Sequence, residues 1–404
     1  MQKQGINIAL IIGISITLLV TVSACHTTKT ASSNEKRNTK DTIVVSEKAT
    51  VDTDTVHRKT LVHRNTSFKP QSKQLTRVDH YNNAFDELES MLKSNEPLDF
   101  KRAVFITENA YFGDSLSYKK FNQSIHSLVT IADRWQSMNK MQEYDFADST
   151  AVKKNGAIFT LMKDTIYFVE NVPLHTPFQY DFEDFLGEKE WSNQFVTKLL
   201  LTGSGNCHSL PYLYKILADE LQAEAYLSLA PNHIYIKHRS KKWGWYNTEL
   251  TSGEFPTDAW VKASGYITLD AIRNGIYMDT LGQKESVALC VYDLAKGYLA
   301  QTKNYQDGFV LKCCDLVLKH DPQNINALIL KAETLKKQYD VFKSNNEISK
   351  AQQAYTQMQQ LYVKGLEMGY REMPLAMYLE WLSSINEQKN KYVNSEINRT
   401  FNNR

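Results

Sequence analysis

The alternation of apolar and polar residues divides the chain into three stretches of different character. Residues 6–20 are almost continuously apolar, and residues 25–78 are dominated by Thr, Ser, Lys and Asn without a sustained period. From about residue 79 onward, apolar residues return at helical or strand spacing. A polar stretch of the second kind buries too little apolar area to offset the entropy lost on ordering. We therefore expect residues 25–78 to be a disordered tether ahead of a globular part.

The globular part begins with three amphipathic segments. Apolar residues recur every three or four positions across residues 81–92, 100–110 and 118–135. This spacing places them on one face of a helix in each segment. We expect residues 79–150 to be a helical lead-in, and its polar residues form no recognisable catalytic set.

Residues 151–284 mix strand and helix patterns. The runs 157–162 and 165–169 predict two strands joined by a turn at Lys163 and Asp164. Leucines at helical spacing then predict a helix that begins close to Cys207 and ends near residue 221. Three further strands are expected after that helix, over residues 225–230, 233–237 and 243–251.

Residues 285–388 return to helical spacing, and the polar stretch 389–404 is expected to be a flexible tail. Asp321-Pro322 ends one helix, and Ala327 opens the next. Helix pairs divided in this way resemble tetratricopeptide repeats. Together with the mixed segment before them, they predict an α+β protein whose C-terminal part consists of helical hairpins.

The residues with the clearest chemical meaning surround Cys207. Residues 203–206, Gly-Ser-Gly-Asn, are turn formers, and Pro211 is tolerated only in the first turn of a helix because it lacks an N–H. Cys207 therefore stands at a helix N-terminus, where unpaired N–H groups and the helix dipole stabilise a thiolate and an oxyanion. We identify Cys207 as the candidate nucleophile, with a buried structural thiol as the alternative.

The strands after this helix supply the other members of a candidate triad. His233 follows Pro231-Asn232 at the start of a strand, where its ring could face Cys207 as a general base. Glu249 and Asn247 share one face of the next strand. Either could accept the second ring N–H of His233 and hold its tautomer.

Other histidines of this region are rivals for the same role. His208 adjoins the nucleophile but is expected to turn away along the helix, and His238 projects from the opposite strand face to His233. Cys207, His208, His233 and His238 are zinc-binding residue types, but they lack a recognisable ligand spacing. We therefore expect neither a metal nor a cofactor.

These blocks resemble the transglutaminase-like superfamily, a papain-related fold with Cys at a helix start, His on one strand and Asp on the next. The resemblance covers about residues 183–255 and rests on Gly205-x-Cys207, Pro231-x-His233 and Trp245-x-x-x-Glu249-x-Thr251. The leucine helix and the C-terminal helix pairs are most similar to the SirB-type branch. The resemblance implies a catalytic triad of Cys207, His233 and Glu249, the last standing where the superfamily usually has Asp.

The N-terminus has the features of a targeting segment. A positive charge at Lys3 precedes an apolar run that is short for a membrane span, and Val22-Ser23-Ala24-Cys25 follows. This pattern resembles the bacterial lipobox, which implies that residues 1–24 are a signal peptide and that Cys25 is lipidated and anchors the protein in a membrane. His26-Thr27 favours the outer membrane, with the protein facing the periplasm. An ordinary signal peptide or an uncleaved anchor is the alternative.

Composition adds two limits. The net charge is only +2, which together with the expected location excludes a nucleic-acid partner. Five cysteines, one of them Cys25, are too few for a disulfide scaffold. A bridge from Cys290 to Cys313 or Cys314 stays open.

Together these features predict an envelope-anchored thiol hydrolase that acts on a peptide or protein through a thioester acyl-enzyme. His233 would deprotonate Cys207, helix N–H groups would stabilise the oxyanion, and Gln194 or Asn247 would act as a helper. The alternative is a catalytically inert scaffold of the same fold, whose C-terminal helices bind a protein partner. The reactivity of Cys207 towards alkylating agents distinguishes the two.

Overall fold

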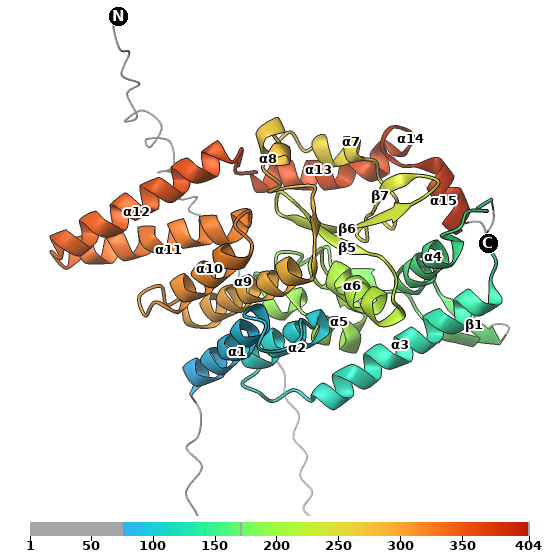
Figure 1. Ribbon diagram of the computed structural model, residues 1–404, viewed down its shortest axis with the longest axis horizontal. Helices are drawn as coiled ribbons and strands as arrows, with labels where there is room; N and C mark the ends of the chain where they lie inside the picture. The colour runs from blue at the N-terminus through green and yellow to red at the C-terminus, as the bar shows by residue number, and fades with distance from the viewer. Residues whose placement is uncertain (1–75, 142, 170–171, 403–404) are drawn as a thin grey trace, which may run out of the picture. The chain divides into compact units, whose positions relative to one another are not determined.

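The computed structural model describes residues 76–402, apart from 142 and 170–171. The expected signal peptide, the expected lipidation site Cys25 and nearly all of the expected tether lie outside the described residues. The described chain has an α+β fold that is dominated by helices and contains a four-stranded sheet (Figure 1). None of its described helices is both long and apolar enough to cross a membrane.

Four helices open the described chain, and polar caps mark where the first three begin. The Thr76 side chain accepts the Asp79 N–H while the Asp79 carboxylate accepts the Thr76 N–H, which is a capping box. Asp99 and Ser117 each accept one N–H at the next two starts. These three helices coincide with the segments predicted as helical. The bounds are α1 Arg77–Leu92, α2 Phe100–Tyr111, α3 Tyr118–Met138 and α4 Ser149–Lys163.

The strand predicted over residues 157–162 is wrong, because these residues form the last turns of α4. All six are buried, so the run has no polar face from which a helical period could be read. Helix α4 packs against α3 and α6 and also buries Asn155. The second predicted strand exists as β1 (Ile166–Val169), but its partner is β2 (Val172–His175).

The four-stranded sheet is antiparallel, with the order β7-β6-β5-β8. Its three longer strands are those that the sequence predicted, and the tight turn between β5 and β6 places Ala230 opposite His233. Helix α6 packs on these two strands. The bounds are β5 Tyr226–Ala230, β6 His233–Ser240, β7 Gly244–Thr248, β8 Thr280–Leu281 and α6 Ser209–Leu221, and a separate parallel pair is formed by β3 Gln179–Tyr180 and β4 Ser204–Gly205.

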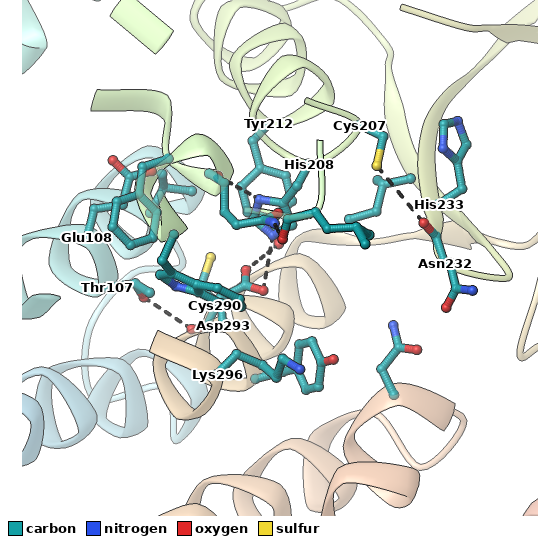
Figure 2. A pocket seen from close by; sticks show the side chains of 18 of the residues that line it. Thr107, Glu108, Cys207, His208, Tyr212, Asn232, His233, Cys290, Asp293 and Lys296 are labelled. Carbon is teal, nitrogen blue, oxygen red and sulfur yellow. Dashed lines mark hydrogen bonds and ion pairs between the residues drawn. The ribbon is translucent and has the colours of Figure 1, made fainter. Parts of the chain in front are cut away.

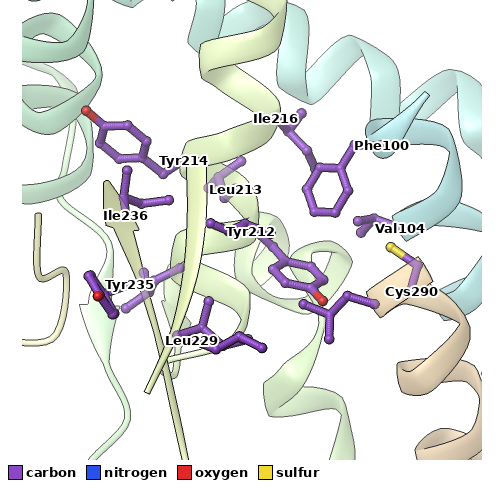
Figure 3. Close-up of a cluster of buried hydrophobic side chains, with 14 of the residues drawn as sticks. Phe100, Val104, Tyr212, Leu213, Tyr214, Ile216, Leu229, Tyr235, Ile236 and Cys290 are labelled. Atoms are coloured by element: carbon purple, nitrogen blue, oxygen red, sulfur yellow. The ribbon is translucent and has the colours of Figure 1, made fainter. Parts of the chain in front are cut away.

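Helix α6 runs through the buried core, and its apolar residues contact elements on both sides. Tyr212 packs edge-on against Phe100 of α2, with ring centroids 5.1 Å apart. Leu213 and Ile236 of β6 belong to the same buried cluster (Figure 3). Each fully buried large side chain of this kind contributes about 1.5–3 kcal/mol. One buried cluster joins the N-terminal helices, the sheet and the C-terminal helices, so the start of α6 is held by all three.

The C-terminal part, from residue 283 onward, is a succession of helices joined by short turns. Neighbouring helices pack in the pairs α9 with α10 and α11 with α12. Asn324 caps α11 through the Ala327 N–H, directly after the predicted break at Asp321-Pro322. The bounds are α9 Gln283–Thr302, α10 Phe309–His320, α11 Ile325–Ser344, α12 Ile348–Glu367, α13 Leu375–Glu387, α14 Lys389–Tyr392 and α15 Ser395–Asn402, and shorter elements are the 3₁₀ turn Trp191–Gln194, α5 Val196–Thr202, α7 Asp258–Lys262 and α8 Leu269–Arg273.

The stretch after residue 388 was predicted to be a flexible tail, but residues 389–402 are folded. Helix α15 buries Ile397 and Phe401. The Phe401 ring stacks on Phe255, with centroids 5.1 Å apart, and lies so close to Gly156 that a Cβ there would collide with it. A few well-placed apolar side chains anchor this segment, and its polar average composition concealed them.

Candidate active site

Cys207 lies in the loop between β4 and α6, and two glycines shape the chain immediately before that loop. Gly203 has a φ of +72°, the left-handed conformation that ends α5. A Cβ on Gly205 would collide with the Ser209 hydroxyl, so a glycine is needed for this close approach. The same hydroxyl accepts the Asn206 N–H at 3.0 Å. The loop therefore holds Cys207 in a fixed position directly ahead of α6.

Asn206 caps α6 and decides which backbone N–H groups stay free. Its Oδ1 accepts the N–H groups of His208 and Ser209 at 3.0 and 3.2 Å, and its amide donates to the Phe185 carbonyl at 2.9 Å. Within the part of the chain that the structure describes, the Cys207 N–H makes no hydrogen bond. The Cys207 N–H is therefore free to donate a hydrogen bond to an oxyanion on a substrate.

His233 and Glu249 form a buried ion pair beside the thiol. Asn232, with a left-handed φ of +58°, turns the chain so that His233 is the first residue of β6. His233 Nε2 lies 2.6 Å from Glu249 Oε2, and the two side chains are 0% and 1% exposed. The structure thus brings Cys207, His233 and Glu249 together.

A tight turn beyond β7 positions the Glu249 carboxylate. The Glu249 N–H donates to the Glu254 carbonyl at 2.9 Å, and the Glu254 N–H donates back at 3.1 Å. Glu249 Oε1 accepts the Thr251 N–H at 2.7 Å while Oε2 faces His233. Glu249 was predicted to lie within β7, but it lies just past the end of this strand. Because both oxygens are engaged, the carboxylate has one orientation.

The charges of the three residues are coupled. Burial alone would raise the pKa of Cys207, but the hydrogen bond and positive charge of His233 outweigh it and lower that pKa. Burial alone would lower the pKa of His233, but mainly the Glu249 carboxylate raises it to about 10. Burial also opposes ionisation of Glu249, and the charge of His233 keeps its pKa below the ordinary value. These shifts favour a thiolate on Cys207 beside an imidazolium on His233 that is paired with the Glu249 carboxylate.

A fourth polar group of the site comes from α13, and sequence reasoning missed it. Tyr378 donates its O–H to Cys207 Sγ at 3.5 Å, and its oxygen lies 3.2 Å from His233 Nδ1. On the same helix, Trp381 stacks on Trp260 with centroids 4.4 Å apart and packs its ring at right angles to His233. Helical spacing could have indicated α13 as a helix, but no local signal connects it with Cys207.

Cys207 opens onto a cavity of about 250 Å³ (Figure 2). Figure 2 shows Cys207 and His233 on one side of the view and Glu108 on the other, with His208, Asp293 and Lys296 between them. Polar side chains therefore occur along the length of the cavity. Aromatic rings that line the cavity are those of Phe185, Trp191, Phe195, Tyr212 and Tyr292. Mixed apolar walls with a few convergent polar groups are typical of substrate sites.

Of the two predicted helper residues, Gln194 lines the cavity and Asn247 does not. Gln194 Nε2 donates to the Leu186 carbonyl at 3.0 Å. The helper role predicted for Asn247 is wrong, because its amide donates to the Pro256 carbonyl and to Asp258 Oδ1 at 3.1 and 2.9 Å. Asn247 therefore holds the chain after β7, and the acceptor beside His233 is Glu249.

His208 turns away from Cys207, as predicted, yet it lines the same cavity. Its Nδ1 lies 2.8 Å from the Gln194 carbonyl, and its Nε2 lies 3.0 Å from Asp293 Oδ1. Burial opposes a charge on His208, but the Asp293 carboxylate raises its pKa above the ordinary value. His208 therefore ties α9 and the 3₁₀ turn to the start of α6.

His238 is a core residue on the other face of β6. Its Nε2 lies 3.0 Å from Thr248 Oγ1, and burial lowers its pKa to about 3. Across the described residues, no group of three or more His, Cys, Asp or Glu side chains could hold a metal ion. Cys290, Cys313 and Cys314 are free, so the bridge that the sequence left open is not formed.

Comparisons with known proteins add little. No protein-family model matches the chain, and no curated protein matches it. A crystal structure of menin, described as revealing the binding site for Mixed Lineage Leukemia (MLL) protein, is similar with a TM-score of 0.28 and 9% sequence identity. The likeness covers 81% of this chain and 91% of the menin chain. A likeness at this TM-score carries no argument about fold or function.

Proposed function

We propose that this protein is a thiol hydrolase that cleaves amide bonds, with Cys207 as nucleophile, His233 as base and acid, and Glu249 as the group that orients His233. The observation that carries the proposal is the buried His233–Glu249 pair, 2.6 Å apart, beside a thiol whose pKa is lowered. Burial raises the pKa of the other thiols among the described residues, Cys290, Cys313 and Cys314. A structural cysteine needs no such pair, whereas a nucleophile does.

In the proposed reaction the Cys207 thiolate attacks the substrate carbonyl carbon, a C–S bond forms, and the carbonyl electrons move to oxygen. The Cys207 N–H stabilises this oxyanion, with Gln194 as a second donor from the cavity wall. His233 gives its proton to the leaving amine, and a thioester remains. Water then gives a proton to His233 and attacks the thioester, so that the acid leaves and the thiolate is restored.

The order of the elements supports a papain-like core of the transglutaminase-like type. Cys207 precedes α6, His233 begins β6, and Glu249 follows β7. In this proposal α9 to α12 are tetratricopeptide-like hairpins that pack on the thiol domain. Lipidation of Cys25 would hold the protein at the outer membrane, facing the periplasm, and the substrate would be a peptide or protein of the envelope.

The alkylation rate of Cys207 against pH, measured with iodoacetamide on the full chain, tests the proposal. We expect an apparent thiol pKa below about 8.5 in the wild-type protein and a higher value in His233→Ala. Cys207→Ser should remove the fast reaction, and peptide mapping should find no fast labelling at the buried Cys290. A slow thiol that is indifferent to His233→Ala would identify the protein as an inert scaffold instead.

A second measurement tests acyl transfer itself. p-Nitrophenyl acetate should acylate Cys207 in the wild-type protein, and the released nitrophenolate should show a burst equal to the enzyme concentration. Mass spectrometry should then find the acetyl group on Cys207. A reactive thiol that never carries an acyl group would restrict the site to redox or binding chemistry.

A further inference from the structure

Two buried phenols, Tyr378 and Tyr180, lie near Cys207, and the Tyr378 hydroxyl is the one that hydrogen-bonds to the sulfur and contacts His233. Its oxygen contacts both reacting groups of the proposed site, at 3.5 Å from Cys207 Sγ and 3.2 Å from His233 Nδ1. Its side chain is almost fully buried, with 1% of the residue exposed. A buried phenol usually finds a hydrogen-bond partner, and the Tyr214 hydroxyl donates to the Asn155 carbonyl at 2.9 Å. Tyr378 instead uses its hydroxyl on the nucleophile and the base.

The surroundings hold the Tyr378 ring in this position. Phe185 stacks on it, with centroids 6.1 Å apart and planes 24° apart, and Trp381 packs beside it on α13. The turn before His233 is tied to the same helix start, because the Asn232 amide donates to the Met373 carbonyl at 3.2 Å. The phenol is therefore preorganised relative to the sulfur, without a flexible loop between them.

We propose that Tyr378 is a further catalytic residue, which donates its hydroxyl hydrogen bond to the Cys207 sulfur while accepting one from His233 Nδ1–H. This inference rests on the function proposed above. It assigns a role to α13, a helix outside the thiol core, and it adds a donor to the three residues that the sequence indicated.

The Tyr378 hydroxyl is suited to act as a hydrogen-bond donor and not as a general base. Burial and the negative charge of Cys207 raise the pKa of Tyr378 well above 10, so the hydroxyl keeps its proton at every pH at which the site works. A hydrogen bond to a charged acceptor is about twice as strong as one to a neutral acceptor. The Tyr378 hydroxyl therefore favours the thiolate over the thiol and stabilises the nucleophile.

The same donor acts again when the acyl-enzyme is hydrolysed. Water oxygen bonds to the acyl carbon and its proton passes to His233. The C–S bond then breaks, and its electron pair returns to sulfur. Tyr378 faces this sulfur and donates to it as the charge reappears, so it lowers the barrier for expulsion of the thiolate.

Tyr378→Phe tests the inference, because it removes the hydroxyl and keeps the stacked ring. We expect the apparent pKa of Cys207, read from the iodoacetamide rate against pH, to rise by about one unit, so that the rate at pH values below both pKa values falls roughly tenfold. The limiting rate at high pH should not fall, because the thiolate itself is unhindered. Acyl-enzyme hydrolysis should slow in the same variant.

Tyr214→Phe is the matched control, since it also removes one buried phenol hydroxyl, but that hydroxyl donates to the Asn155 carbonyl of α4 and not to the Cys207 sulfur. Thermal melting of both variants reports any loss of folding, and the ultraviolet absorbance of the thiolate gives the titration without a reagent. A Tyr378→Phe titration that superimposes on the wild-type curve would overturn the inference and leave the thiol hydrolase standing. A wild-type thiol that is unreactive at neutral pH would instead remove the proposed function itself.

Discussion

Replacing Glu249 by glutamine tests the charge argument most directly. The amide keeps the shape and can accept the His233 Nε2–H, but it removes a negative charge that lies 2.6 Å from the ring. Two unit charges about 4 Å apart interact by about 4 kcal/mol at an effective dielectric constant of about 20, which equals about 3 pKa units. The pKa of His233 is about 10 with the carboxylate present. In Glu249→Gln it should fall to about 7.

Because His233 would lose its positive charge at a lower pH, Cys207 should keep its proton to higher pH; removal of the Glu249 charge, which disfavours the thiolate, opposes this effect but is the smaller of the two. We expect the iodoacetamide profile of Glu249→Gln to shift upward by at least about one unit, so the rate near neutral pH falls at least about tenfold. Asp321→Asn is the control, because Asp321 is also buried but pairs with Asn324 between α10 and α11. A Glu249→Gln profile equal to that of the wild-type protein, with the fold intact, would refute the argument.

Three further predictions concern stability, and urea unfolding measures each of them. Gly205→Ala drives a Cβ into the Ser209 hydroxyl and should cost about 1–3 kcal/mol; an unchanged midpoint would mean that the loop has room. Phe401→Ala should cost about 3 kcal/mol because its ring packs on Gly156, whereas a flexible tail would tolerate the change. Burial raises the pKa of Glu108 from 4.5 to about 7. The buried neutral carboxyl therefore contributes fully to stability below pH 4.5, and this contribution is lost as the pH rises through about 7. That loss amounts to about 3 kcal/mol, and Glu108→Gln should abolish this part of the pH dependence.

The sequence marks the candidate site well wherever local signals build it. Two glycines and a proline place Cys207 at a helix start, and a Pro-Asn turn places His233 at the start of a strand. These patterns act within a few residues, so one chain is enough to read them. The residue that accepts the His233 N–H was harder to identify. Asn247 and Glu249 share one face of the predicted strand, and the choice between them depends on where β7 ends. The turn between Glu249 and Glu254 decides that point through its backbone hydrogen bonds.

Features that depend on distant contacts were not readable in the same way. Residues 157–162 carry no period because every side chain is buried, so a helix and a strand look alike there. The packing of α15 depends on the contact of Phe401 with Gly156. The contribution of α13 to the candidate site depends on the hydrogen bond from Tyr378 to Cys207. Neither residue propensity nor residue spacing indicates such long-range contacts, because they are determined by tertiary packing.

The contact between Tyr378 and Cys207 joins residues that are 171 positions apart, and it has a consequence for how the protein matures. Such a contact cannot form before the chain has been synthesised as far as Tyr378, and closing so long a loop costs entropy, which slows its formation. A chain that has not yet acquired α13 can hold Cys207, His233 and Glu249 near one another while the sulfur still lacks its phenol donor. On the proposed role of Tyr378, the Cys207 thiol therefore stays less reactive during synthesis. It reaches full reactivity only after α13 has been synthesised and has packed beside it.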